Sequence, residues 1–274
     1  MTWRPLELPA GEPVAGSPAL FAQLKLRSPE LQNYRDVLVA LPPSYDSTNR
    51  SYPLVIMHDG QNLFDPDTSF AGSWGMIGVL RDLAAEGVEA IVAGIANTGP
   101  FRRYEYSPFR DPRHGGGDGA RYLGFLIDQV IPRVESAFRI TSGPEGRVIA
   151  GSSMGGLVSL YGFWKHPDIF GAAAALSPSA WFADEAIIDF IRQRPLPPGR
   201  LWLDTGTAEG KLMLESVRRL RDAIGECGLT PGPRFEYVED EGAGHSEEHW
   251  GRRMRAALRF LLRPTDRPTD RLTD

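Results

Sequence analysis

The fold of this chain is decided by one short stretch, Arg147-Val148-Ile149-Ala150-Gly151-Ser152-Ser153-Met154-Gly155-Gly156. A β-branched run delivers a serine into a turn between glycines, and an apolar helical segment follows at once. This order is typical of a nucleophile elbow, in which a strained turn from strand to helix pushes the serine hydroxyl out of the sheet. Gly151 and Gly155 suit the turn, because a side chain at either position would crowd the meeting point of strand and helix. Ser153 is therefore the predicted nucleophile.

A Gly-x-Ser-x-Gly match is a weak signal by itself in a chain with 30 glycines among 274 residues. The catalytic interpretation is favoured by the strand before the motif, the helix after it, and Gly156, which permits close packing. Ser152 is the alternative hydroxyl. It falls one residue early, where the turn would not project it in the same way.

Strands and helices alternate along most of the chain from Tyr52 onward, after two β-type segments that predict an antiparallel entry. This order predicts an α/β fold of the α/β-hydrolase type, with a mostly parallel central sheet and helices on both faces. The expected strands are 21–26, 34–41, 54–58, 90–96, 148–150, 172–176, 201–204 and 235–238. The expected helices are 74–86, 121–138 (with a kink at Pro132), 157–164, 186–193, 211–226 and 247–262.

The length suits one α/β-hydrolase domain over residues 1–262. Residues 263–274 repeat the polar unit Arg-Pro-Thr-Asp, which cannot form a core and predicts a disordered tail. The Gly- and Pro-rich connection 97–119 is too long for a passive turn, so we expect a functional loop there.

Composition excludes several classes of protein. A net charge of −5 and a pI of about 5.6 argue against nucleic acid as a partner. The single cysteine, Cys227, excludes an intrachain disulfide and fits a reducing compartment. The N-terminus lacks the pattern of a signal peptide, and no apolar run is long enough to span a bilayer, so we expect a cytoplasmic protein without membrane contact. The histidines and the cysteine lack metal-ligand spacing, so neither a metal nor another cofactor is expected. Nothing in the sequence defines an oligomeric state.

A serine nucleophile needs a base, and the base needs an orienting acid; in this fold they follow in the order serine, acid, histidine. His245 follows the last predicted strand across a flexible loop, where a base able to reach the elbow belongs. His249 is the alternative, but it lies within or beside the next helix. His58, at a strand end, is expected to have a structural role instead.

Two carboxylates are candidates for the acid. Leu201-Trp202-Leu203-Asp204-Thr205-Gly206-Thr207-Ala208-Glu209 is a strand that ends in a glycine turn. Glu209 lies past the strand, where the acid belongs, whereas Asp204 is still in or next to the strand. Position favours Glu209 and leaves Asp204 as the alternative.

The oxyanion hole is expected to use two backbone N–H groups. One belongs to Met154, directly after the nucleophile. The other belongs to the loop after the strand 54–58, where Gly60 permits a turn and makes the amide of Gln61 the best candidate.

At these residues the chain resembles the putative-esterase family of α/β-hydrolases, which includes enterochelin-type esterases, feruloyl esterases, S-formylglutathione hydrolases (esterase D) and mycolyltransferases. The resemblance runs from about Tyr34 to Leu262. It implies an acid at Glu209 and a base at His245. A histidine precedes the serine in the S-formylglutathione hydrolase branch, whereas this chain has Ser152, which argues against that branch. The matching motifs are His58-Asp59-Gly60-Gln61-Asn62-Leu63-Phe64-Asp65, Arg103-Tyr104-Glu105-Tyr106-Ser107-Pro108, Ala150-Gly151-Ser152-Ser153-Met154-Gly155-Gly156-Leu157, Leu176-Ser177-Pro178-Ser179, Gly206-Thr207-Ala208-Glu209 and Gly244-His245-Ser246-Glu247.

The loop 97–119 carries Arg102, Arg103 and Tyr104, a set that can hold an anionic or catecholic acyl group by hydrogen bonds and stacking. The equally weighted alternative is that Arg103 pairs with Glu105 or another carboxylate. Trp74 and Trp181 are further candidates to line the cleft, although aromatic residues near helices are more often core.

Three functions are consistent with these residues. The first is a serine esterase that hydrolyses a small-molecule carboxylic ester, aromatic, siderophore-like or carbohydrate-linked, through an acyl-enzyme. The second is an acyltransferase with the same triad. The third is a non-catalytic binding protein of the same fold, which the intact serine, acid and histidine disfavour.

Overall fold

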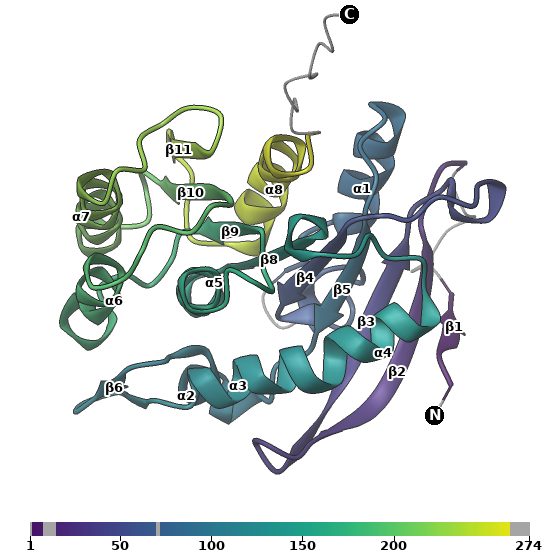
Figure 1. Ribbon diagram of the computed structural model, residues 1–274, viewed down its shortest axis with the longest axis horizontal. Coiled ribbons are helices and arrows are strands. Elements are labelled where there is room, and N and C mark those ends of the chain that lie inside the picture. The colour runs from purple at the N-terminus through teal and green to yellow at the C-terminus, as the bar shows by residue number, and fades with distance from the viewer. Residues whose placement is uncertain (1, 8–14, 70–71, 264–274) are drawn as a thin grey trace, which may run out of the picture.

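The computed structural model describes residues 2–7, 15–69 and 72–263 (Figure 1). The strands are β1 (Arg4–Leu6), β2 (Ala19–Ser28), β3 (Asn33–Leu41), β4 (Leu54–His58), β5 (Ile91–Ile95), β6 (Arg110–Asp111), β7 (Gly115–Gly116), β8 (Arg147–Ser152), β9 (Ala172–Leu176), β10 (Arg200–Gly206) and β11 (Phe235–Asp240). The α-helices are α1 (Met76–Ala85), α2 (Arg102–Tyr106), α3 (Gly119–Phe125), α4 (Ile131–Ala137), α5 (Met154–Lys165), α6 (Phe182–Arg192), α7 (Lys211–Glu226) and α8 (Glu247–Leu261).

Nine strands form one sheet in the order β1-β2-β3-β5-β4-β8-β9-β10-β11. The pairs from β5 through β4, β8, β9 and β10 to β11 are all parallel, whereas β1, β2, β3 and β5 pair antiparallel. The predicted α/β-hydrolase fold, with a mostly parallel sheet and an antiparallel entry, is confirmed. Because the strands from β4 to β11 run in one direction, their carboxyl ends meet at a single edge, where ligands bind in open α/β sheets.

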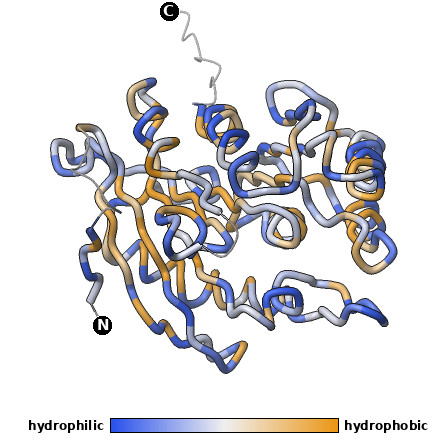
Figure 2. The backbone as a smooth tube through the Cα atoms, turned by 180° about the vertical axis from the view of Figure 1, so that it is seen from behind, coloured by the Kyte–Doolittle hydropathy of each residue, from blue (hydrophilic) through white to orange (hydrophobic). Residues whose placement is uncertain are grey.

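Helices cover both faces of the sheet, and the strands are buried between them. In β4, Leu54 and Ile56 pack into the apolar cluster that contains α3 to α7, while Val55 and Met57 pack into the cluster that contains α1 and α8. Figure 1 shows α1 and α8 on one side of the sheet and α3 to α5 on the other. Strands buried on both faces carry continuous apolar sequence, which appears as orange segments through the middle of the molecule in Figure 2.

The long connection 97–119 is not irregular throughout. It contains α2 and the small β6–β7 ladder, and α2 packs against α3 and α5. Its backbone is tied down by hydrogen bonds from Gly117 and Gly119 N–H to Ser107 O at 3.0 and 2.9 Å. Three of the residues predicted to contact substrate, Arg102, Arg103 and Tyr104, therefore lie on helix α2.

Two helices differ from their predicted form. The segment 121–138 is divided by a π-helical turn, Leu126–Val130, and Pro132 lies in the first turn of α4, where a proline is tolerated. Helix α6 begins at Phe182, four residues before its predicted start, and opens with the left-handed residues Ala183, Asp184 and Glu185. Sequence patterning could not indicate three left-handed residues without glycine.

The predicted polar tail, 263–274, lies outside the described residues except for Arg263. Across the described ranges, no helix is both long and apolar enough to cross a membrane.

Candidate active site

Ser153 occupies the corner between β8 and α5. Its backbone has a φ of 57° and a ψ of −122°, a conformation that costs a non-glycine residue about 1–3 kcal/mol. Three backbone hydrogen bonds hold it: Ser153 N–H donates to Leu176 O at 3.0 Å, and Ser153 O accepts from Ser179 N–H at 3.0 Å and from Leu157 N–H at 3.1 Å. Ser152 is buried at the end of β8, whereas Ser153 is only half-buried. The turn therefore presents Ser153, and not Ser152, at the carboxyl edge of the sheet.

The elbow depends on glycine at position 151. A Cβ atom there would lie 2.7 Å from His58 Cδ2 and 2.9 Å from the carbonyl carbon of Gly155. Both distances are too short for a methyl group, so β4, β8 and α5 can meet only if residue 151 has no side chain.

His245 and Glu209 lie side by side at the same edge, beyond the ends of β11 and β10. His245 Nδ1 is 2.8 Å from Glu209 Oε2. The carboxylate is fully buried and the imidazole is 33% exposed. The indole of Trp250 meets the imidazole at right angles, with ring centroids 4.6 Å apart. When Nδ1 donates its proton to Glu209, Nε2 is left as a proton acceptor, which is the state that a general base requires.

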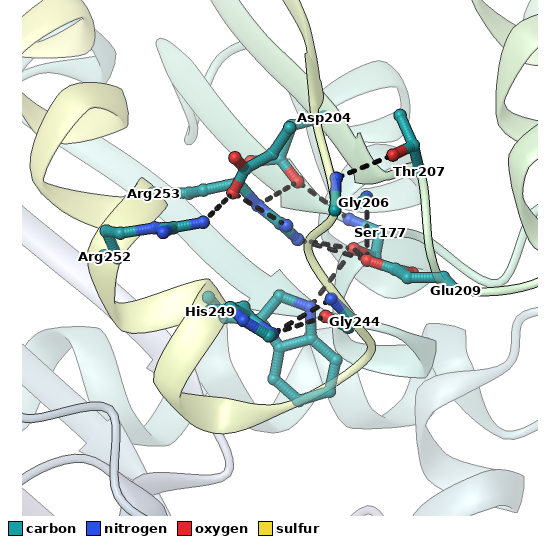
Figure 3. A network of polar contacts seen from close by, with 12 residues as sticks. Ser177, Asp204, Gly206, Thr207, Glu209, Gly244, His249, Arg252 and Arg253 are labelled. Atoms are coloured by element: carbon teal, nitrogen blue, oxygen red, sulfur yellow. Dashed lines mark hydrogen bonds and ion pairs between the residues drawn. The ribbon is translucent and has the colours of Figure 1, made fainter.

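The other oxygen of Glu209 is held by protein groups as well (Figure 3). Glu209 Oε1 accepts hydrogen bonds from the Ser177 hydroxyl at 2.5 Å, the Gly206 N–H at 2.8 Å and Arg253 Nη2 at 3.3 Å. Burial acts to raise the pKa of the Glu209 carboxyl, yet the hydrogen bonds from His245 and Ser177 hold this pKa below its usual value. Glu209 is thus an ionised carboxylate with a single orientation.

Asp204, the alternative acid, has a different position. It is fully buried within β10, where it accepts hydrogen bonds from Trp202 Nε1 at 2.8 Å and Ser177 N–H at 3.1 Å, and it forms an ion pair with Arg253. Burial raises the pKa of Asp204 to about 6, although Arg253 acts in the opposite direction. The carboxylate next to His245 is Glu209, because Glu209 lies past the strand end and Asp204 does not.

The Ser153 hydroxyl bonds to that of Ser179, with 3.3 Å between the two Oγ atoms. Among the described residues no hydrogen bond joins Ser153 to His245. The turn after β9 links the two halves of the site, since Ser179 contacts the Ser153 hydroxyl and Ser177 contacts Glu209. Sequence reasoning gave Ser177 and Ser179 no role; their only signal was their place in a motif shared with the family.

His249 contacts the loop that carries His245. Its Nδ1 lies 3.0 Å from Gly244 N, 3.1 Å from Gly244 O and 3.1 Å from Ser246 Oγ. Gly244 and Ser246 flank His245, so His249 holds the loop that carries the imidazole.

The two predicted oxyanion donors begin helical turns. Met154 is the first residue of α5, and Gln61 lies in a short 3₁₀ helix, Gly60–Asn62, directly after β4. Amides in the first turn of a helix have no partner within that helix. Met154 lines the cavity at Ser153, whereas Gln61 is not among its lining residues. The side chain of Gln61 is held in place, since its Oε1 accepts a hydrogen bond from Asn97 N–H at 3.1 Å.

A cavity of about 570 Å³ opens at Ser153. Four of the five predicted substrate contacts line it, together with aromatic and cationic groups from the loop 97–119 and the start of α6. This volume suits a small molecule. The lining residues are Gly99, Pro100, Arg102, Arg103, Tyr104, His114, Ser153, Met154, Ser179, Trp181 and Phe182.

The two neighbouring arginines have different partners. Arg102 forms two hydrogen bonds of 2.7 Å to the carboxylate of Asp59. Arg103 is exposed and has no ion-pair partner within the described ranges. Glu105, the alternative partner of Arg103, instead accepts hydrogen bonds from Arg35 at 2.9 Å and Asn33 at 2.7 Å. Arg103 therefore provides an uncompensated positive charge on the cavity wall.

Trp74 lies elsewhere, and its predicted contact with substrate is not supported. It is 3% exposed and packs against Trp250, with ring centroids 5.9 Å apart, in the cluster between α1 and α8. Gly251 brings α8 onto it, since a Cβ there would lie 2.0 Å from Trp74 O. Trp74 is a core residue because the apolar face of α8 covers it.

Two further histidines complete the picture. His58 is fully buried beneath the elbow, and its Nδ1 is 2.8 Å from the Tyr122 hydroxyl, so its contact is to a side chain rather than to backbone. His114, on the cavity wall, packs edge-on against Trp181; the glycine-rich sequence around it gave no signal of this position. Within the described ranges no group of three or more His, Cys, Asp or Glu side chains could hold a metal ion.

Comparison with known proteins places the chain in a family. It matches the family described as "Putative esterase" over residues 28–261. The uncharacterized protein YbbA of Bacillus subtilis (strain 168) is 28% identical over 237 residues, which cover 81% of this chain and 90% of YbbA. Esterase Rv1288 of Mycobacterium tuberculosis (strain H37Rv) is 28% identical over 183 residues, which cover 66% of this chain and 37% of that protein.

Solved structures share the fold at low sequence identity. The enterobactin esterase FES from Shigella flexneri superimposes with a TM-score of 0.71 at 18% identity, covering 94% of this chain and 60% of that one. The siderophore hydrolase EstA from Aspergillus nidulans gives 0.68 at 20% identity, covering 92% and 97%. A ferulic acid esterase gives 0.67 at 19% identity, covering 90% and 98%. The chain therefore belongs to the Putative esterase family and is a carboxylic ester hydrolase with the α/β-hydrolase fold.

Proposed function

We propose that this protein hydrolyses a small-molecule carboxylic ester through an acyl-enzyme on Ser153, with His245 as general base and Glu209 as the acid that orients it. The observation that carries the proposal is the 2.8 Å contact between His245 Nδ1 and the buried Glu209 carboxylate, at the sheet edge where the elbow presents Ser153. We also infer that residues 1–262 act as one catalytic domain, because the three residues follow the ends of β8, β10 and β11, which belong to one sheet.

The reaction follows from these positions. The Ser153 hydroxyl turns from Ser179 toward His245, and its Oγ attacks the ester carbonyl carbon while its proton passes to His245 Nε2. The oxyanion accepts hydrogen bonds from Met154 and Gln61 N–H. The imidazolium then protonates the departing alcohol, which leaves an acyl-enzyme. Water attacks next, gives a proton to His245, and the acid product is released as Ser153 regains its proton.

The cavity wall favours an ester whose acyl part is aromatic and carries negative charge. Arg103 offers a guanidinium without a carboxylate partner, and Tyr104, Trp181 and Phe182 offer aromatic surface beside it. The acyl part of a feruloyl ester is aromatic but uncharged at neutral pH, so it matches the aromatic part of this description alone. Two of the structures of similar fold are named for siderophores and ferulic acid.

Hydrolysis of p-nitrophenyl acetate by the wild type and by Ser153→Ala tests the nucleophile. We expect the variant to lose nearly all turnover, and the wild type to form a covalent serine adduct with a fluorophosphonate at Ser153, detected by mass spectrometry. Equal turnover in the two proteins would contradict the proposal.

A panel of esters tests the substrate class. Catechol lactones, feruloyl sugars, short aliphatic esters and matched neutral and anionic aromatic esters are compared by kcat/KM, and the anionic aromatic members are expected to lead. Product analysis with added alcohols shows whether water is the acceptor. Transfer to alcohol in preference to water would replace the hydrolase with an acyltransferase that uses the same triad.

A further inference from the structure

A buried arginine stands behind the predicted catalytic acid. Arg253, in the second turn of α8, is 5% exposed. Its Nη2 donates hydrogen bonds to the Ser177 hydroxyl oxygen at 2.7 Å and to Glu209 Oε1 at 3.3 Å. Its Nε lies 3.1 Å from Asp204 Oδ1, and its Nη1 lies 3.5 Å from Asp240 Oδ2. One guanidinium thus joins the ends of β9, β10 and β11.

The second carboxylate, Asp204, contacts Arg253 and Ser177, the two residues that bind Glu209. It pairs with Arg253, and it accepts the N–H of Ser177, whose hydroxyl donates to Glu209. Asp204 itself is anchored by Trp202 Nε1 at 2.8 Å. Figure 3 shows Arg253 and Ser177 lying between Asp204 and Glu209. The contacts of Arg253 Nε with Asp204 and of Arg253 Nη1 with Asp240 are ion pairs without hydrogen-bond geometry, whereas Nη2 makes the hydrogen bonds to Ser177 and Glu209.

The shape of the guanidinium suits this place. Its planar fork can bind two carboxylates on different edges, whereas a lysine ammonium is a point charge on a flexible chain. Two carboxylates buried near each other would repel if no cation lay between them. Arg253 therefore supplies both geometry and charge compensation to the acid.

We propose that Arg253 is a positioning residue of this esterase, which holds the Glu209 carboxylate in place and ionised for His245. The proposal rests on the proposed function, because it requires Glu209 to be the catalytic acid. Arg253 does not touch the reacting atoms. It acts through Glu209 on the orientation and basicity of the imidazole.

Loss of the Arg253 guanidinium should shift the pH profile of kcat/KM in one direction. The groups that face Glu209 are His245 and Arg253; Asp204 and Asp240 lie on the far side of the guanidinium, and Glu247 lies near His245. Removing the cation makes protonation of the Glu209 carboxyl easier, and the reaction needs this carboxyl ionised. The acid limb of kcat/KM should therefore move to higher pH.

The test compares Arg253→Ala, Arg253→Lys and Arg252→Ala in the full chain with p-nitrophenyl acetate. Arg252 is the matched control, since it is the preceding arginine on α8, 62% exposed and paired with Asp240. We expect kcat of Arg253→Ala to fall roughly 100-fold at unchanged KM, because small displacements of a catalytic group cost about this much, and its acid limb to rise. Arg253→Lys should keep the acid limb of the wild type, because lysine keeps the positive charge. It should lose part of kcat, because an ammonium group lacks the planar fork of the guanidinium. Arg252→Ala should match the wild type.

Guanidinium ions, added below the concentrations that unfold the protein, provide a second readout. They should restore activity and the acid limb to Arg253→Ala and leave Arg252→Ala unchanged. A folded Arg253→Ala with the activity of Arg252→Ala would overturn the proposal, and so would a loss of kcat with an unmoved acid limb and no rescue. If Arg253→Ala does not fold, the lysine variant decides: full wild-type kcat overturns the proposal. Failure of the proposed function is separate, because it would appear as full turnover in Ser153→Ala.

Discussion

His245 meets Glu209 through Nδ1, which lies 2.8 Å from Oε2, while the opposite oxygen of the carboxylate accepts the Ser177 hydroxyl at 2.5 Å. Each oxygen of the buried acid therefore has its own partner. No hydrogen bond of His245 Nε2 is found in the part of the chain that the structure describes, and this nitrogen is the one that a serine base uses.

Glu209→Gln should lower kcat by roughly 10²- to 10⁴-fold, because an amide can present N–H to Nδ1 and stabilise the wrong tautomer. KM should change little, since Glu209 does not line the cavity. Steady-state kinetics measure the effects on kcat and KM separately. The control is Glu248→Gln, an exposed carboxylate in the first turn of α8. Similar kinetics for the two variants would show that Glu209 is not the catalytic acid.

Arg102→Ala should destabilise the protein rather than only weaken binding. The guanidinium is 28% exposed and holds the buried Asp59 carboxylate by two hydrogen bonds of 2.7 Å. Breaking a buried pair costs about 3–5 kcal/mol, and partial exposure reduces this to about 2 kcal/mol. Urea unfolding gives the value. The double variant with Asp59→Asn should recover part of the loss, because no charge is then left unpaired; additive losses would contradict this account.

Arg103→Ala should leave stability unchanged and weaken binding of anionic esters. A hydrogen bond to a charged group contributes about 1.5–3 kcal/mol, so KM for an anionic aromatic ester should rise at least about tenfold. KM for the matched neutral ester should not change. Arg110→Ala, on β6 and away from the cavity wall, is the control. Equal effects on both esters would remove Arg103 from substrate recognition.

Gly206→Ala should lower activity by displacing Glu209 or the loop before His245. The added Cβ would lie 2.2 Å from Ala243 O and 2.8 Å from Glu209 Oε1, so the loop before His245 or the acid must move. Activity should fall by roughly 100-fold. The control is Gly225→Ala in α7, where a Cβ meets no atom within 4 Å, and where alanine should stabilise the helix by up to about 1 kcal/mol. Esterase assays and thermal melts on both variants make the comparison, and an active Gly206→Ala would show that this edge can relax.

The buried His58 should make stability depend on acidity. Burial lowers the pKa of His58 to about 3, whereas the unfolded chain takes up the proton near the usual value of about 6.5. Between these values the unfolded state binds more protons, so stability is complete above pH 6.5 and falls as pH drops toward 3, by up to about 1.4 kcal/mol per pH unit.

Urea unfolding at several pH values between about 4 and 7 measures this slope in the wild type and in His58→Gln, which should lose this contribution. Tyr122→Phe keeps the histidine and removes only its hydroxyl partner, so the slope should persist there. An unchanged slope in His58→Gln would assign the acid sensitivity to other groups.

The layout of the fold was readable from local chemistry. Buried parallel strands are continuous apolar runs, and the elbow needs glycine where backbones meet, so β4, β8 and β9 were predicted with nearly correct bounds. The predicted order serine, acid, histidine is compatible with this topology, which places the loops after successive parallel strands at one edge. The apolar strands and the glycine turn depend on residues that are close in the sequence, so the size and polarity of each side chain are enough to predict them.

Assignments that depend on a distant partner needed the assembled molecule. Arg102 and Arg103 are adjacent and chemically identical, yet only Arg102 meets the buried carboxylate of Asp59, so only Arg103 keeps its charge for the cavity. Trp74 belongs to the core because α8 covers it, and Arg253 contacts Glu209 across 44 positions of sequence. The two arginine contacts form because a buried charge is stable only next to an opposite charge or a hydrogen-bond partner. The tertiary packing decides which carboxylate lies close enough to be that partner.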